Sequence, residues 1–93
     1  MIKLKIKFLR PFSEAVGKNK LEIDLDGRTL MDLLKMLVNR YPKLEKEFFT
    51  TKDKLTEYIC IFVNDKPISA LNGLDTELKN DDNLLFFIPV SGG

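Results

Sequence analysis

The amino-acid sequence predicts an α+β fold in which one helix packs across one face of a mixed sheet. Several short segments alternate apolar with charged residues, as strands with one buried face do, and residues 29–41 carry apolar residues three and four apart, as an amphipathic helix does. The 93 residues are 44% hydrophobic and 31% charged, which suits one core but not two. We therefore expect a single domain over residues 1–93, with its strands and helix in two layers.

The first two strands are predicted from their alternation. Between Ile2 and Phe8 every second residue is apolar, and the residues between them are lysines. Residues 10–20 contain a proline, a glycine and an asparagine, which favour a chain reversal, and residues 21–25 then alternate again. These segments predict a β-hairpin that ends at Asp26-Gly27.

The helix has recognisable boundaries. Thr29 can accept a hydrogen bond from a free amide group at the helix start, and Asp32 lies in the first turn, where negative charge is favourable. Pro42 stops the helix. Its apolar stripe consists of Leu30, Leu33, Leu34, Leu37, Val38 and Tyr41. A second short helical turn is predicted over residues 43–49.

The second half of the chain is predicted to add the remaining strands. Residues 50–57 are polar and predict a loop, whereas residues 58–63 are uninterrupted β-formers and predict a strand. A turn at residues 64–67 leads to a short strand at residues 68–71. The last strand is expected at residues 84–88.

Composition and charge exclude several classes of function. The net charge is +1 with the signs interspersed, which argues against a nucleic-acid partner. The chain has no histidine and one cysteine, so we expect no bound metal or cofactor and no internal disulfide. The longest apolar run, Leu84 to Pro89, is far shorter than the roughly 20 residues of a membrane span, and the N-terminus does not resemble a signal peptide. We therefore expect no membrane anchor and a cytoplasmic location.

Inside the domain, the polar candidates for chemistry favour structural roles. They are two acid pairs, a thiol and a lysine stripe: Asp24 and Asp26, Asp81 and Asp82, Cys60, and Lys3, Lys5 and Lys7. Each acid pair lies at a turn, where aspartate bonds its own backbone. The thiol lies among apolar residues and is expected to act as a small hydrophobic side chain. The lysines predict a solvated strand face, and the alternative is a surface that meets an acidic partner.

The C-terminal residues Val90-Ser91-Gly92-Gly93 offer a different kind of chemistry. A terminal glycine pair is often frayed and without function. Because glycine has no Cβ, however, such a pair can also lie extended in a slot too narrow for any side chain and bring the carboxylate of Gly93 to a nucleotide bound by another enzyme. Attack of that carboxylate on the α-phosphate of ATP gives an acyl-adenylate, which then accepts sulfur or an amine. The catalytic side chains would belong to the partner.

The chain resembles the small subunit of molybdopterin synthase, a ubiquitin-like β-grasp sulfur carrier. The resemblance rests most specifically on the terminal string from Leu84 to Gly93, and more weakly on Phe8 to Gly17, on Thr29 to Leu34 at the start of the helix, and on Val63-Asn64. These patches occur in the right order over nearly the whole chain. The β-grasp order of elements also agrees with the strands and helix predicted above.

This resemblance implies a defined function and two partners. An E1-like adenylyltransferase would use ATP to adenylate Gly93, and sulfur would replace AMP to give a thiocarboxylate. The tail, residues 89–93, would then enter the large subunit of molybdopterin synthase, so this chain is a subunit without catalytic side chains of its own.

The resemblance also implies a docking surface, because in the family a hydrophobic sheet surface docks both partners. If Leu84, Phe86 and Ile88 face the helix, alternation turns Leu85 and Phe87 outward. The same alternation on the middle strand exposes Tyr58, Cys60 and Phe62. The expected partner-binding residues are Phe62, Leu85, Phe87, Pro89, Val90 and Ser91, and Gly92 keeps the tail thin. The alternative is that loops cover these side chains.

Some positions depart from the family pattern. Asp81 stands where the family usually has a turn glycine, and aspartate tolerates positive φ. Ile88 replaces the first of two prolines, and the segments 50–57 and 70–77 are longer than in a typical member. None of these differences affects the glycine pair.

Four other functions are compared with the sulfur carrier. A ubiquitin-like modifier would join Gly93 to a protein lysine, and a thiazole-synthesis sulfur carrier would deliver the same sulfur elsewhere. The thiazole carriers are usually shorter and lack the Phe-Phe-x-Pro approach to the tail. A β-grasp ferredoxin is excluded because an iron–sulfur cluster needs four cysteines. The last alternative is an interaction domain whose terminal glycines have no role.

Overall fold

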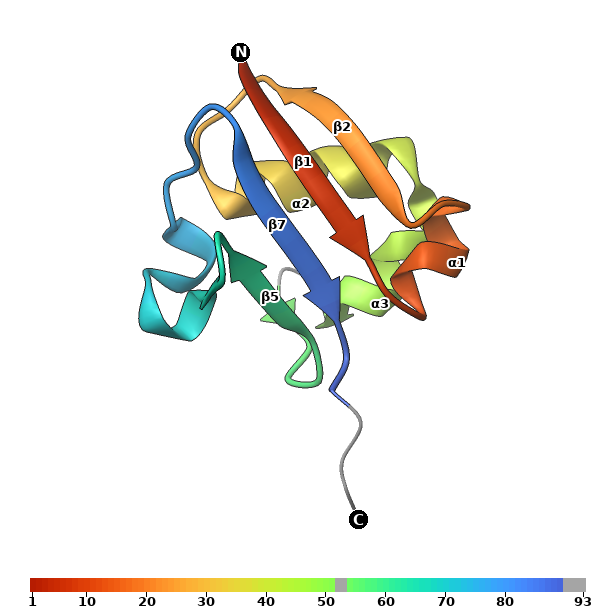
Figure 1. Cartoon of the computed structure of the whole chain (residues 1–93). Helices are drawn as coiled ribbons and strands as arrows, with labels where there is room; N and C mark the ends of the chain where they lie inside the picture. Colours follow the sequence, from red (N-terminus) through yellow and green to blue (C-terminus); the bar gives the residue numbers. More distant parts are fainter. Residues whose placement is uncertain (52–53, 90–93) are drawn as a thin grey trace.

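The computed structural model describes residues 1–51 and 54–89, which form a mixed five-stranded sheet with helices on one side (Figure 1). The strand order is β2-β1-β7-β5-β6. Their bounds are β1 (Ile2–Phe8), β2 (Lys20–Leu25), β5 (Cys60–Val63), β6 (Lys66–Pro67) and β7 (Asp82–Phe87). β7 runs parallel to β1 and antiparallel to β5, and the two hairpins are antiparallel. The predicted β-grasp architecture is confirmed.

Helix α2 (Leu30–Arg40) lies across one face of the sheet and begins with the predicted cap. The hydroxyl of Thr29 accepts from the amide of Asp32 at 3.2 Å, and the Asp32 carboxylate accepts from the amides of Arg28 at 3.0 Å and Thr29 at 3.1 Å. These bonds satisfy amide groups that have no partner within the helix, as a capping box does. Because they stabilise the charged form, they lower the pKa of Asp32.

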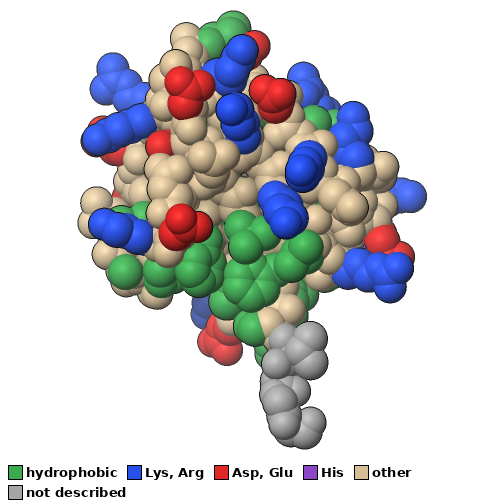
Figure 2. Space-filling model, viewed as in Figure 1, with side chains coloured by type: hydrophobic (Ala, Val, Ile, Leu, Met, Phe, Trp, Pro, Cys, Tyr) green, Lys and Arg blue, Asp and Glu red, His purple; other side chains and the backbone are tan. Residues whose placement is uncertain are grey.

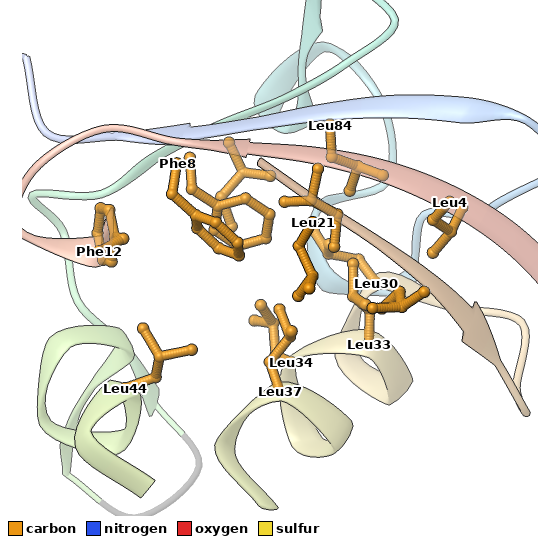
Figure 3. Packing of buried hydrophobic residues seen from close by; sticks show 14 of the residues in the cluster. Leu4, Phe8, Phe12, Leu21, Leu30, Leu33, Leu34, Leu37, Leu44 and Leu84 are labelled. Atoms are coloured by element: carbon orange, nitrogen blue, oxygen red, sulfur yellow. The ribbon is translucent and has the colours of Figure 1, made fainter. Parts of the chain in front are cut away.

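The core lies between α2 and the sheet (Figure 3). Leu33, Leu34 and Leu37 of α2 point toward the sheet and are fully buried. Four buried aromatic rings form a cluster at one end of the core: Phe8, Phe12, Phe48 and Phe86. Each such side chain removed from water contributes roughly 1.5–3 kcal/mol to folding. Apolar burial of this kind holds the helix and the sheet together.

The reversal between β1 and β2 contains a short helix that was not predicted from the turn residues. The segment predicted as a hairpin turn folds into α1 (Phe12–Val16), with Pro11 before it and Gly17 in a left-handed conformation after it. The Gly17 amide donates to the carbonyl of Ser13 at 2.8 Å. Phe12 and Val16 are four residues apart and both buried, so one helical turn places both in the core.

The helical turn predicted over residues 43–49 is present, but the loop predicted at residues 50–57 is partly wrong. A 3-10 turn (Pro42–Leu44) leads into α3 (Glu45–Phe48). β3 (Phe49–Thr51) and β4 (Lys54–Leu55) then pair as a small antiparallel sheet. Phe49 and Leu55 pack against the core, and these two apolar side chains make the polar segment a hairpin.

Three segments in the second half also differ from prediction, and one of them is β7, which covers Asp82–Phe87 rather than residues 84–88. β5 begins at Cys60 rather than at residue 58, and Tyr58 lies in the preceding turn with 72% of its surface exposed. The residues predicted as a short strand at 68–71 form a 3-10 turn instead (Ile68–Ala70). Asn64 and Asp65 both have positive φ and reverse the chain in two residues, so the pairing with β5 falls on β6, two residues earlier. A further 3-10 turn covers Gly73–Asp75.

None of the helices in the described ranges 1–51 and 54–89 has the length and apolar character needed to cross a membrane.

Candidate docking face and C-terminal tail

The faces of the two central strands are those that alternation predicted. In β7, Leu84 and Phe86 are buried against the core, whereas Leu85 and Phe87 point to the other face and are half-buried. Ile88, just beyond the strand, packs against the core as expected. In β5, Cys60 and Phe62 are likewise half-buried and point outward. We call the outward face of the sheet the open face, because α2 covers the opposite one.

Strand pairing gathers these outward side chains into one apolar patch. Phe62 lies opposite Leu85, Cys60 lies opposite Phe87, and Pro67 lies opposite Phe62 on its other side. The rings of Phe62 and Phe87 are 5.7 Å apart between centroids. The apolar patch is defined as Cys60, Phe62, Pro67, Leu85 and Phe87. Figure 2 shows hydrophobic side chains gathered on this face where the chain leaves β7. Because its members are partly accessible, neighbouring loops do not fully cover the patch.

One apolar residue at the border of the patch was not singled out from the sequence. Leu9 follows β1 directly and is 43% exposed. Its amide donates to the carbonyl of Phe86 at 3.0 Å, which holds it beside the end of β7. The signal was available, because Leu9 continues the outward positions of Lys3, Lys5 and Lys7.

The other half of the open face is charged, as predicted for the lysine stripe. Lys3, Lys5 and Lys7 of β1 are all exposed. In the register of the hairpin, Lys3 faces Asp24 and Lys5 faces Glu22. Figure 2 shows Lys and Arg side chains directly beside the hydrophobic group. The open face therefore has an apolar half on β7 and β5 and a charged half on β1 and β2.

The acid pair at the start of β7, Asp81 and Asp82, is structural. Asp81 has a φ of 70° and donates its amide to the carbonyl of Lys3 at 2.7 Å, so it performs the turn expected of a glycine. The buried Asp82 carboxylate accepts from the side-chain amide of Asn64 and from the backbone amide of Lys79, both at 2.7 Å. The Asn64 side-chain oxygen in turn accepts from Asn83 at 2.9 Å. This network joins the start of β7 to the end of β5.

The predicted reactive residues lie outside the part of the chain that the structure describes. These are Gly92 and Gly93, and the predicted partner-binding residues Val90 and Ser91 lie there too, so the freedom of the tail to enter a partner stays a prediction. The described residues do reach Pro89, which is exposed. Residues 90–93 would span at most about 14 Å when fully extended.

Comparison with known proteins identifies the family of this chain. The model of the ThiS family matches residues 6–93. A ubiquitin-related modifier 1 homolog of Drosophila willistoni is 35% identical over 75 residues, which cover 77% of this chain and 75% of the relative.

Two solved structures have the same fold over all or nearly all of the chain. The small archaeal modifier protein 1 of Methanosarcina acetivorans has a TM-score of 0.86 at 34% identity, covering 100% of this chain and 98% of that one. A putative molybdopterin converting factor subunit 1 from Pyrococcus furiosus has a TM-score of 0.77 at 29% identity, covering 97% and 100%. The chain therefore belongs to the ThiS family and has the β-grasp fold of its ubiquitin-like sulfur carriers and modifiers.

Proposed function

We propose that this protein is a sulfur carrier whose C-terminal Gly93 is activated as an acyl-adenylate and converted to a thiocarboxylate. The observation that carries the proposal is the apolar patch on the open face, at the end of the strand that leads into the Gly92-Gly93 tail. A partner enzyme binds the domain through the patch, and the tail is the part that reacts. Partly exposed aromatic side chains on a small domain are typical of such a contact surface.

The chemistry places the catalytic side chains on the partner. An oxygen of the Gly93 carboxylate attacks the α-phosphate of ATP, and pyrophosphate leaves. A sulfur nucleophile supplied by the partner system then attacks the acyl carbon, and AMP leaves. Sulfide gives the thiocarboxylate directly; a persulfide gives an acyl disulfide, whose S–S bond a thiol of the partner system cleaves, so that the thiocarboxylate is released and the two donor sulfurs become a disulfide. This chain contributes the carboxylate, a tail without bulky side chains at its end, and the surface that positions both. Exclusion of water from the activated acyl group falls to the partner's active site.

We further propose that the sulfur goes to molybdopterin, with this chain as the small subunit of molybdopterin synthase. The similarity to the putative molybdopterin converting factor subunit of Pyrococcus furiosus supports this acceptor, as does the run Phe86-Phe87 followed by Pro89 before the tail. The two partners are then an E1-like adenylyltransferase, which uses ATP, and the synthase large subunit. Both would contact the same apolar patch, so they would bind one after the other.

A second function shares the activation step and differs only in the acceptor. The relatives from Drosophila willistoni and Methanosarcina acetivorans are both described as modifiers. In that case a protein lysine attacks the activated Gly93 carbonyl and forms an isopeptide bond. The structure of the domain suits either outcome, because the acceptor is chosen after the tail has been activated.

Intact mass spectrometry of the protein purified from its own cells separates these outcomes. Replacement of one C-terminal oxygen by sulfur supports the carrier, whereas branched peptides joined through Gly93 support the modifier. A tail that stays unmodified in cells that make the cofactor would refute both. Deletion of Gly93 provides the matched variant: it should abolish thiocarboxylate formation and leave the free energy of unfolding unchanged. Thiocarboxylate formed by the deleted protein would show that Gly93 is not the reactive residue.

A further inference from the structure

A single row of side chains crosses the open face from its charged half to its apolar half. The register places Lys20 opposite Lys7, Lys7 beside Leu85, Leu85 opposite Phe62, and Phe62 opposite Pro67. These five residues come from five neighbouring strands. Adjacent strands are about 4.8 Å apart, so the backbone positions of Lys7 and Lys20 lie about 10 Å and about 14 Å from that of Phe62. One partner segment can therefore contact both halves.

The pairing of Lys7 with Lys20 distinguishes this row from its neighbours. Lys3 and Lys5 each face an acid across the hairpin, namely Asp24 and Glu22, whereas Lys7 faces another lysine. Like charges directly opposite each other in an antiparallel pair destabilise it. This pairing therefore does not stabilise the hairpin. A negative charge bound beside the two lysines would reduce the repulsion between them.

The surface beside this pair is hollowed. A depression of about 540 Å³ is bordered by Lys7 and Lys20 on one side and by Phe62 and Leu85 on the other. Lys5 and Glu22, which face each other, also border it, and Asp65 lies at its far side on the turn between β5 and β6. Lysines thus dominate the end of the depression at β1 and β2, and apolar side chains dominate the end at β7 and β5.

We propose that this depression selects protein partners that present a carboxylate next to an apolar side chain. The apolar side chain packs on Phe62 and Leu85, and the carboxylate lies between the ammonium groups of Lys7 and Lys20. The attraction between the carboxylate and the two ammonium groups contributes association rate and choice of partner more than affinity, because these three groups stay near water. The inference rests on the proposed function in taking the open face as the docking face, and it adds the chemistry by which a partner is recognised.

The test uses the full chain labelled with ¹⁵N and a matched pair of blocked pentapeptides. In one peptide glutamate alternates with leucine and phenylalanine, and in the other glutamine replaces each glutamate. At low salt the acidic peptide should shift the amide signals of Lys7, Lys20, Phe62 and Leu85 and bind about fivefold more tightly than the amide peptide, the preference that two exposed charge pairs can supply. At 1 M NaCl, where the screening length is about 3 Å, the preference should disappear.

Two variants assign the preference to the lysine pair. The double variant Lys7→Gln and Lys20→Gln removes the like-charge pair, so it should fold and lose the preference for the acidic peptide. Lys3→Gln changes a lysine on the same strand and face that already has an acid opposite it, so it should keep the preference. Equal binding of the two peptides, no shift from the acidic peptide at millimolar concentration, or equal loss in both variants would overturn the proposal. The peptides require no adenylation, so these results are independent of the mass measurement that tests Gly93.

Discussion

Phe86 and Phe87 are neighbours in β7 but point to opposite faces of the sheet, so alanine at the two positions should have different effects. Phe86 is fully buried and contacts three other buried rings, with centroid distances of 5.4 Å to Phe8, 5.5 Å to Phe48 and 6.3 Å to Phe12. Phe87 is half-buried and pairs with the ring of Phe62 alone among the described aromatic residues. The first substitution removes part of the core, and the second removes part of the proposed docking face.

The expected magnitudes follow from these surroundings. Phe86→Ala loses the buried ring and leaves a cavity, which costs about 3–5 kcal/mol of unfolding free energy. A domain of this size has only about 5–14 kcal/mol in total. Phe87→Ala loses a partly exposed ring and one aromatic pair, which costs about 1 kcal/mol. With a urea m-value of about 1.5 kcal/mol/M, the midpoints should fall by about 2–3 M and by less than about 1 M respectively.

Urea unfolding followed by circular dichroism measures both values, and binding to the adenylyltransferase provides the second readout. Phe87→Ala should weaken that binding while remaining folded, and Phe86→Ala should fail mainly through loss of stability. Comparable losses of stability in the two variants would show that the outward assignment of Phe87 is wrong. Unchanged binding by a folded Phe87→Ala would show that the open face is not the docking face.

Three further predictions concern the helix boundaries. Thr29→Ala should lower the unfolding free energy by about 1 kcal/mol because it removes the acceptor for the Asp32 amide, and Thr29→Ser should restore most of it; equal losses in denaturant unfolding would argue against the cap. The pKa of Asp32 is lowered in the folded state, so its contribution is complete above its unfolded pKa of about 3.9 and is lost as the pH falls through its lower folded pKa. The stability difference between wild type and Asp32→Asn should therefore shrink in unfolding curves taken at increasingly acidic pH, and a difference that is independent of pH would contradict this. Gly17 has a φ of 90° with open space where a Cβ would be, so Gly17→Ala should cost about 1–2 kcal/mol through backbone strain alone, measured by thermal unfolding. Gly17→Asn should cost less, and a harmless Gly17→Ala would refute that reasoning.

Regular alternation and clear end signals made most of the fold predictable. The strand faces of β1, β2 and β7 follow from a period of two, and α2 follows from its stripe and its cap. Some elements too short to show a period were missed, namely α1, β3 and β4. α1 spans five residues between Pro11 and Gly17. These two residues indicated a chain reversal, but the single helical turn between them is too short to show a helical period.

The candidate site was predictable only in part, for a similar reason. The outward direction of Leu85, Phe87 and Phe62 followed from alternation within each strand. Which residue lies beside which depends on register between strands far apart in the sequence, and no local pattern encodes it. The position of Leu9 beside the end of β7 emerged only from that register, although its outward direction followed from alternation. The pairing of Lys7 with Lys20 depends on the register of the first hairpin, which the unpredicted helix α1 sets.

The position of β7 between strands β1 and β5 has a mechanical consequence for any enzyme that pulls on the tail. β7 is bonded along one edge to β1, with pairs from Leu4–Asp82 to Phe8–Phe86, and along the other edge to β5, with pairs from Cys60–Phe87 to Val63–Leu84. A load applied beyond Phe87 along the strand axis acts on both ladders in shear, so many hydrogen bonds share it and none can be unzipped singly. A partner that binds or releases the C-terminal end can thus pull on it while β7 stays paired with β1 and β5.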